Sequence, residues 1–143
     1  MAEPLITLDE ITFAYPGGAR PVLENFSFQL LPGQKVGLIG PNGSGKTTLL
    51  HLIMGLLRPQ QGRIIIFGQE RRQEQDFVPV RQRIGLLFQN ADDQLFCPTV
   101  LEDVAFGPLN QGRTVAEAKA IAQETLARLG ISDFGDRITY KLS

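Results

Sequence analysis

The segment that most restricts the fold of this chain runs Gly40-Pro41-Asn42-Gly43-Ser44-Gly45-Lys46-Thr47 and satisfies the pattern G-x-x-x-x-G-K-[ST]. Its glycines let the backbone turn tightly and approach an anion without a Cβ in the way. The backbone N–H groups from Gly43 to Thr48 then form a concavity at the positive end of a helix that we expect to start near Lys46. Lys46 brings a full charge to phosphate oxygens, and the Thr47 hydroxyl can ligate Mg²⁺. The loop therefore predicts a site for ATP or a closely related nucleoside triphosphate.

The residues on either side of this loop fit the same prediction. Residues 36–39 read as a short apolar strand, and residues 46–57 are apolar on nearly all sides, which predicts a buried helix that stops at residues 58–62. An ordinary glycine-rich turn does not explain Lys46-Thr47 at the start of an apolar helix. We interpret His51, one turn into this helix, as a packed or hydrogen-bonded histidine rather than a catalyst.

The N-terminal third predicts an antiparallel arrangement. Residues 5–15 alternate apolar and polar side chains imperfectly and break at Pro16-Gly17-Gly18, which predicts a strand followed by a turn. A second alternating run, residues 26–30, ends in turn residues 31–34.

The rest of the chain changes from strands to helices. We predict strands over residues 63–68 and 84–88, and a solvated loop over the polar residues 69–82. Thr114-Val115-Ala116-Glu117 forms a capping box, and Gly130 is placed to end the helix that follows. The apolar residues of that helix fall on one stripe: Val115, Ala118, Ile121, Ala122, Leu126 and Leu129.

Composition narrows the class of protein. With 143 residues, 43% of them apolar, the chain is long enough for one compact domain or most of one, and a net charge of −1 gives no case for nucleic-acid binding. The single cysteine, Cys97, excludes an internal disulfide framework, and we interpret it as a small buried hydrophobe rather than a reactive thiol. The N-terminus lacks the features of a signal peptide, and no apolar stretch is long enough to cross a bilayer. Any association with a membrane must therefore come through a partner.

Several segments together carry a family resemblance. Residues 40–48 resemble the Walker A motif of ABC-type ATPases, residues 84–89 (Ile-Gly-Leu-Leu-Phe-Gln) resemble the strand and Q-loop of that family, and residues 13–17 (Phe-Ala-Tyr-Pro-Gly) resemble its A-loop. Residues 89–108 resemble one subgroup, the energy-coupling ATPases of vitamin and of cobalt or nickel importers.

The resemblance implies an α/β fold. It would have a P-loop NTPase core, an N-terminal antiparallel β subdomain and the start of a helical subdomain, truncated before the signature and Walker B motifs. As a partial nucleotide-binding domain over residues 1–143, it would divide into an antiparallel β part (about 1–34), a P-loop core part (35–90) and the start of the helical subdomain (91–143).

The resemblance also implies the residues of the nucleotide site. Tyr15 would stack on the adenine, although it also fits the description of the last core residue of a strand. Thr47 would ligate Mg²⁺, and the side-chain carbonyl of Gln89 would reach Mg²⁺ or the attacking water. The expected nucleotide-binding residues are Tyr15, Gly40, Pro41, Asn42, Gly43, Ser44, Gly45, Lys46, Thr47, Thr48 and Gln89.

The partners follow from the same resemblance. It implies a cytoplasmic protein, peripheral on the inner face of the cell membrane, with a transmembrane coupling subunit against residues 89–108 and a second ATPase subunit in a head-to-tail dimer. We interpret Asp92 and Asp93 as a solvated acidic loop rather than a metal site, because no further ligands follow at regular spacing.

The chain departs from the family pattern at its end. It stops at Leu142-Ser143, two residues into the Leu-Ser-Gly-Gly-Gln signature, before the Walker B strand, the catalytic Glu and the switch His. We therefore expect no catalytic residue within this chain, no turnover by it alone, and marginal stability or a tendency to associate. Two functions stay open: the N-terminal portion of an importer ATPase that takes up a metal ion or vitamin, or a nucleotide-binding module without turnover. A small P-loop kinase would need an arginine-rich lid where residues 113–130 instead predict a helix.

Overall fold

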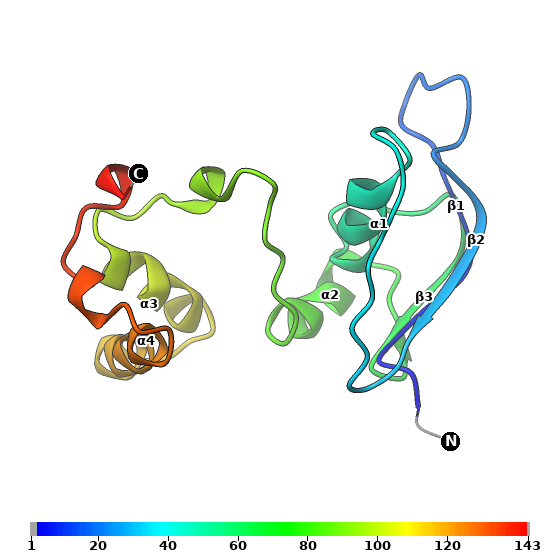
Figure 1. The fold of residues 1–143 in the computed structure, drawn as a ribbon. Coiled ribbons are helices and arrows are strands. Elements are labelled where there is room, and N and C mark those ends of the chain that lie inside the picture. The colour runs from blue at the N-terminus through cyan, green and yellow to red at the C-terminus, as the bar shows by residue number, and fades with distance from the viewer. Residues whose placement is uncertain (1–2, 143) are drawn as a thin grey trace. The chain divides into compact units, whose positions relative to one another are not determined.

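A computed structural model describes residues 3–142 of the chain. They fall into two compact units, Met1–Leu86 and Leu87–Ser143, and each is described by itself. The first unit contains all the named strands and helices α1 and α2, and the second contains helices α3 and α4 (Figure 1).

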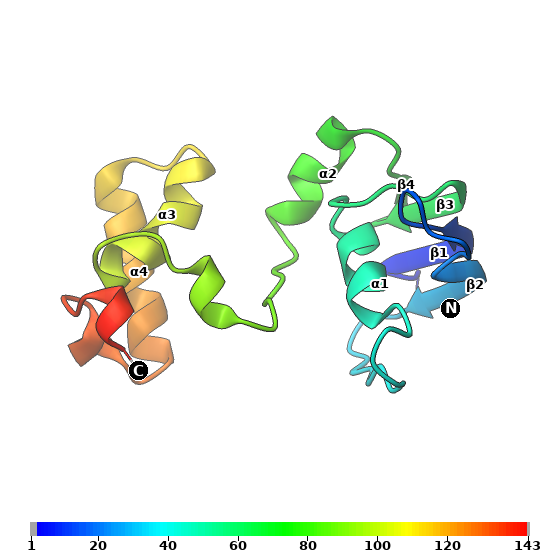
Figure 2. The same cartoon turned by 90° about the horizontal axis from the view of Figure 1, so that it is seen from above.

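The first unit is built on a four-stranded antiparallel sheet with the strand order β2-β1-β3-β4. Its strands are β1 (Ile6–Phe13), β2 (Leu23–Leu30), β3 (Gln61–Ile66) and β4 (Gln69–Glu70). The antiparallel pairing expected for the two N-terminal runs is confirmed. Helix α1 (Lys46–Ile53) lies along one face of this sheet (Figures 1 and 2).

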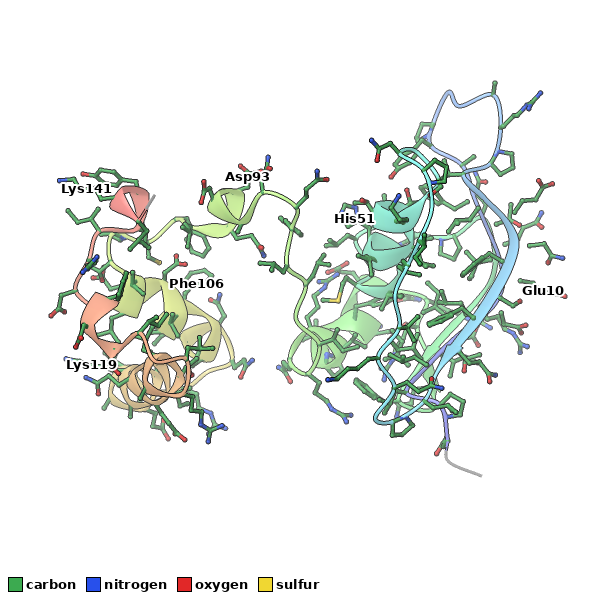
Figure 3. The ribbon with its side chains drawn as sticks, viewed as in Figure 1. Glu10, His51, Asp93, Phe106, Lys119 and Lys141 are labelled. Atoms are coloured by element: carbon green, nitrogen blue, oxygen red, sulfur yellow. The ribbon has the colours of Figure 1, made fainter. Side chains whose placement is uncertain are left out.

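A bulge in β1 explains why its sequence alternates imperfectly. Ile6 and Leu8 are buried, then the pairing register with both neighbouring strands shifts, and burial resumes at Ile11. Glu10 has a positive φ of 51° and lies on the face of the sheet opposite α1 (Figure 3). The extra residue keeps the apolar side chains after the bulge directed at the core.

The core of the first unit lies between the sheet and the helices. It is formed by large apolar side chains from β1, β3, α1 and α2 and from the start of β2. Its buried members are Ile6, Leu8, Ile11, Phe13, Leu23, Leu49, Leu52, Ile53, Ile64, Ile66, Phe77 and Val80.

Helix α1 ends earlier than its apolar composition predicts. We expected a helix as far as residue 57, but it ends at Ile53, and Gly55 follows with a φ of +68°. A Cβ on Gly55 would lie 2.3 Å from the Phe77 ring, so the position needs glycine for conformation and for space. The close packing of Phe77 thus fixes where the helix stops.

The prediction of a solvated loop over residues 69–82 is wrong. These residues form β4 and the helix α2 (Glu74–Arg81), and α2 buries Phe77 and Val80 in the core. The Arg81 side chain donates to the carbonyl oxygens of Met54 and Gly55 at the end of α1. Only two apolar residues of α2 face the core, which is too few to produce a recognisable helical periodicity.

The two strands predicted at residues 36–39 and 84–88 are also not formed. Neither segment forms strand pairing with any part of residues 3–142, and Ile39 is fully exposed. A strand is defined by pairing with a neighbour, which an apolar sequence does not supply by itself. Together with α1 and the sheet, Val36, Leu38 and Ile84 line an apolar hollow of about 240 Å³.

The second unit is helical. It consists of α3 (Val100–Asn110), α4 (Val115–Arg128) and three 3₁₀ turns, Ala91–Gln94, Ser132–Phe134 and Thr139–Lys141. A capping box starts each α-helix. The box predicted at Thr114 and Glu117 is confirmed, and Thr99 and Glu102 form a second one. Gly130 follows α4 with a φ of +71°, as expected for a residue that ends a helix.

Small side chains form the contact between α3 and α4. The buried cluster consists of Ala105, Ala118 and Ala122, with Leu101 and Val104 packed against it. Of the predicted stripe on α4, Ala118, Ala122 and Leu126 are buried, whereas Val115, Ile121 and Leu129 are exposed.

Candidate nucleotide-binding site

The glycine-rich loop turns sharply before it enters α1. The Ser44 N–H donates to the Pro41 carbonyl at 3.2 Å, and Gly43 and Gly45 have φ values of 82° and 89°. A Cβ on Gly45 would lie 3.0 Å from Cγ1 of Val22, so the loop packs closely against the residue that precedes β2. Glycine at this position therefore meets both a steric and a conformational requirement.

The N-terminus of α1 points its backbone donors into this loop. The helix begins at Lys46, its N-cap is Gly45, and its first acceptor is the Gly45 carbonyl, which takes the Leu49 N–H at 2.8 Å. The N–H groups before Leu49 have no acceptor within the helix, because the first turn of any α-helix leaves its donors unpaired. Its first turn carries no acidic side chain. These N–H groups and the helix dipole together favour an anion at this end.

The Lys46 side chain folds back over the loop. Its Nζ donates to the carbonyl oxygens of Gly40 and Pro41, both at 2.8 Å, and lies 3.5 Å from Oγ of Ser44. The loop carbonyls thus hold the ammonium group within the curve of the loop, beside the first turn of α1. A positive charge and a set of backbone donors are therefore concentrated in one place.

Tyr15, in the segment that follows β1, contacts the first turn of α1. It lies two residues beyond the end of β1, is 43% exposed, and its hydroxyl lies 3.0 Å from Oγ1 of the buried Thr48. Its ring also meets the Phe13 ring edge-on, with centroids 4.9 Å apart. Tyr15 is therefore not a core residue of the strand. The contact with Thr48 holds an exposed aromatic ring next to the loop.

The remaining side chains predicted to bind the nucleotide are exposed. Pro41, Asn42, Ser44 and Thr47 are exposed within or directly after the loop. Gln89 is exposed and belongs to the second unit, so its contribution to the site stays a prediction.

The acidic residues Asp92 and Asp93 lie exposed in the 3₁₀ turn Ala91–Gln94. Within residues 3–142 we find no group of three His, Cys, Asp or Glu side chains arranged to hold a metal ion. None of the helices in this described range is long and apolar enough to cross a membrane.

Sequence reasoning did not identify the side chains that support the loop. Val22 packs against Gly45, and Phe13 packs against Tyr15. Both are ordinary apolar residues of the N-terminal sheet region, and nothing local in the sequence marks their contact with a loop far along the chain.

Comparison with known proteins gives consistent matches. A family model described as ABC transporter matches residues 23–143. A putative ABC transporter ATP-binding protein of Nitratidesulfovibrio vulgaris is 54% identical over 140 residues, which cover 98% of this chain and 51% of that protein. The cobalt import ATP-binding protein CbiO of Rhodobacter capsulatus is 46% identical over 98% of this chain and 50% of its own length.

Two further matches concern energy coupling and structure. The energy-coupling factor transporter ATP-binding protein EcfA of Methanothermobacter thermautotrophicus is 41% identical over 97% of this chain and 45% of its own length. The structure of cbiO1 from Clostridium perfringens, part of the ABC transporter complex cbiONQ, has a TM-score of 0.84 and 30% identity over 99% of this chain and 56% of that one. The chain thus spans about half the length of these relatives.

Proposed function

The chain belongs to the ABC transporter ATP-binding family, and from this premise we propose that its loop, residues 40–48, binds the phosphates of Mg-ATP within an energy-coupling importer. The observation that carries the proposal is the position of Lys46. Its Nζ is held by the Gly40 and Pro41 carbonyls at the N-terminus of α1. A phosphate at this point would meet a full positive charge, backbone donors and the positive end of a helix dipole together.

The other residues of the site have separate roles in the proposal. The Tyr15 ring would stack on the adenine, in an orientation fixed by its hydroxyl contact with Thr48. The Thr47 hydroxyl and Gln89 would ligate Mg²⁺, which would neutralise phosphate charge. The exposure of Tyr15 and Thr47 supports these assignments, because both side chains are accessible to a ligand.

The proposal of an importer rests on the relatives. The names of two of them describe cobalt import and an energy-coupling factor transporter, and one solved relative is part of a transporter complex. We propose uptake of a metal ion or vitamin, with the chain held at the inner face of the membrane by a transmembrane coupling subunit and paired with a second ATPase subunit.

An exposed aromatic pair on the second unit supports a docking role. Phe96 is 61% exposed and Phe106 40% exposed, and their rings meet edge-on at 4.4 Å. Large exposed apolar side chains in contact with one another are typical of protein interfaces. With the membrane subunit of its transporter, the chain should co-purify in detergent, and a Phe96→Ser, Phe106→Ser double variant should be lost from the complex. Recovery of this variant at the wild-type yield would contradict the docking role.

Equilibrium binding of a fluorescent ATP analogue with Mg²⁺ tests the nucleotide site. We expect Lys46→Ala to raise the dissociation constant by about tenfold to a hundredfold, because it removes a charged partner of the phosphates. Lys119→Ala is the matched control, since Lys119 lies exposed on α4 (Figure 3) and the change in charge is the same. Equal affinities of the two variants would refute the proposal.

Tyr15 allows a finer test in the same assay. Tyr15→Phe keeps the ring and removes the hydroxyl contact with Thr48, whereas Tyr15→Ala removes both. If the ring stacks on the base, Tyr15→Ala should weaken binding by about tenfold and Tyr15→Phe by much less. Equal losses for the two variants would assign the effect to the hydroxyl instead.

A further inference from the structure

A second hollow in the first unit is lined by arginines. It encloses about 280 Å³ between residues 58–59 and the β3–β4 hairpin. Its charged lining residues are Arg58, Arg63, Glu70, Arg71 and Arg72, and none of its lining residues belongs to the loop at residues 40–48. The nucleotide proposal therefore makes no use of it.

Arg71 is the unusual member of this lining, because it is buried. Its side chain donates to the Ile66 carbonyl from Nε and Nη2, at 3.3 and 3.0 Å, and to the Asp76 carbonyl from Nη1 at 3.0 Å. None of the ion pairs among residues 3–142 includes Arg71. A buried charge in a protein normally faces an opposite charge, and here only carbonyl dipoles face it.

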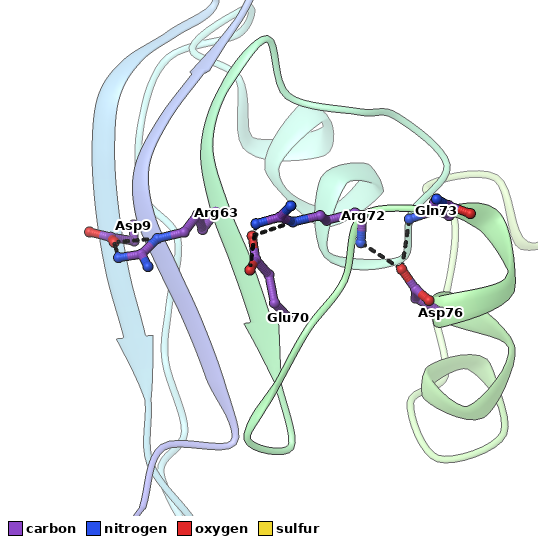
Figure 4. A network of polar contacts seen from close by, with 6 residues as sticks. All are labelled: Asp9, Arg63, Glu70, Arg72, Gln73 and Asp76. Carbon is purple, nitrogen blue, oxygen red and sulfur yellow. Dashed lines mark hydrogen bonds and ion pairs between the residues drawn. The ribbon is translucent and has the colours of Figure 1, made fainter.

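The Asp76 carboxylate is already engaged by other donors. It accepts the backbone N–H groups of Gln73 and Arg72 at 2.8 and 2.9 Å (Figure 4). These two hydrogen bonds are the main reason that the pKa of Asp76 is lowered, and the charge of Arg71 adds to them. The Asp76 carboxylate therefore acts on Arg71 at longer range, whereas the Asp76 carbonyl accepts a hydrogen bond from it.

Two exposed arginines of the hollow, Arg63 and Arg72, are held by weak surface pairs. Arg63 donates to Asp9 across β1 and β3, and Arg72 makes two hydrogen bonds to Glu70, at 2.8 and 2.9 Å (Figure 4). The Arg63 and Arg72 side chains are 60% and 73% exposed. Exposed ion pairs contribute little to stability, so these arginines can turn toward a ligand at small cost. Four arginines and one carboxylate, Glu70, line the hollow, and further carboxylates lie around it: Asp9 beside Arg63, and Asp76 and Glu74 within electrostatic range of Arg71 and Arg58.

We propose that this hollow binds a phosphate-bearing anion with at least two negative charges, at a site separate from the nucleotide loop. The guanidinium group matches phosphate oxygens because it presents paired N–H donors in one plane. Arg71 supplies a fixed charge at the wall, and Arg58 and Arg72 supply mobile ones. The phosphate can belong to a soluble compound or to a phospholipid headgroup, since both offer the same oxygens.

Calorimetric titration with pyrophosphate in a Lys46→Ala background tests the site without the main cation of the nucleotide loop. We expect saturable binding, and an Arg58→Gln, Arg72→Gln double variant should raise the dissociation constant by about tenfold. The matched control is Arg20→Gln with Arg113→Gln, which removes the same charge at exposed positions outside the hollow and should change the constant by less than about twofold. Far-UV circular dichroism verifies that both variants keep their fold.

Glu70 provides a test with the opposite sign. Glu70→Gln removes a negative charge from the hollow and releases Arg72 from its pair, so pyrophosphate should bind several-fold more tightly. If Glu70 only stabilises the hairpin, Glu70→Gln will not bind pyrophosphate more tightly than the wild type does.

Sedimentation with vesicles of anionic phospholipid distinguishes the two sources of phosphate. Binding to vesicles but not to pyrophosphate, with the same dependence on Arg58 and Arg72, would assign the site to a lipid headgroup. The proposal is overturned if neither probe binds, or if the double variant and its matched control bind equally.

Discussion

The two units of this protein differ in the size of the side chains that form their buried clusters. The first unit packs large residues such as Leu8, Ile66 and Phe77 into one core between the sheet and the helices. The second unit buries a smaller set, three alanines where α3 meets α4 together with Val100 and Leu126, and leaves large side chains such as Phe96 and Tyr140 exposed, at 61% and 76%. The two cores have no residue in common.

This difference relates to what each unit has to do. Burial of large apolar groups is the main favourable term in folding, and in the first unit it fixes α1, which directly follows the proposed nucleotide loop. The second unit buries fewer large apolar side chains, and capping boxes start both of its α-helices. Its exposed apolar groups remain available to a partner. The proposed nucleotide loop and the proposed docking surface thus lie in separate units.

The largest expected effect tests the core of the first unit. Leu52 is fully buried on α1, and Leu52→Ala should lower the free energy of unfolding by about 3 to 4 kcal/mol because it removes buried methyl groups and leaves a cavity. Leu50→Ala, on the same helix but 39% exposed, is the control and should cost about 1 kcal/mol or less. Urea denaturation measures both values.

Hydrogen exchange would show where the effect of Leu52→Ala lies. Amides of β1 and β3 should lose protection, whereas those of α4 should change little, because Leu52 belongs only to the first core. Equal losses in β1 and α4 would mean that the two units unfold together, and the contrast between them would then not extend to stability.

The parts that sequence reasoning predicted correctly depend on residues close together in the chain. The capping box at Thr114 and Glu117 and the terminating Gly130 follow from local hydrogen bonds and backbone conformation, and the structure confirms them. The glycine-rich loop was recognised in the same way. Its fixed positions at Gly40, Gly45 and Lys46 lie within one short segment, and the structure confirms the helix start at Lys46, whereas the nucleotide chemistry of the loop stays a prediction.

The parts that sequence reasoning missed depend on distant contacts. Helix α2 exists because Phe77 packs on Gly55 and Arg81 caps the end of α1, and neither contact leaves a periodic pattern in the sequence. The contact between Tyr15 and Thr48 joins residues 33 positions apart. Apolar residues 36–39 were predicted to be a strand, but pairing depends on a neighbour and not on composition.

A smaller effect tests whether the buried cluster between α3 and α4 tolerates a larger side chain. Ala118 is fully buried against the small residues of α3, and Ala118→Leu should destabilise the second unit by about 1 to 3 kcal/mol through overpacking. Ala120→Leu places the same side chain on the exposed side of α4 and should change stability by about 0.5 kcal/mol or less. Hydrogen exchange of α4 amides gives both values. If Ala118→Leu is tolerated as well as Ala120→Leu, the helix contact is loose.

The smallest expected effect concerns pH and the start of α4. The Glu117 carboxylate accepts from the backbone N–H and the hydroxyl of Thr114, both at 2.8 Å, and these bonds lower the pKa of Glu117 below its ordinary value. A carboxyl with a lowered pKa in the folded state stabilises that state fully above the unfolded pKa, which is about 4.3, and this contribution is lost as the pH falls through the folded value. The first turn of α4 should therefore fray in acid, visible in the Cα chemical shifts of residues 115–118.

Two substitutions separate this capping effect from general acid denaturation. Glu117→Gln can keep a hydrogen bond to Thr114 but cannot titrate, so the first turn should retain its shifts in acid up to the global transition. Glu124→Gln removes a carboxylate on the same helix that pairs with Arg128 and has no part in the cap, so its acid profile at residues 115–118 should match that of the wild type. If all three proteins fray at the same pH, the start of α4 is not held by its cap. Local hydrogen bonds would then not account for the start of α4, and packing of α3 against α4 would have to hold it.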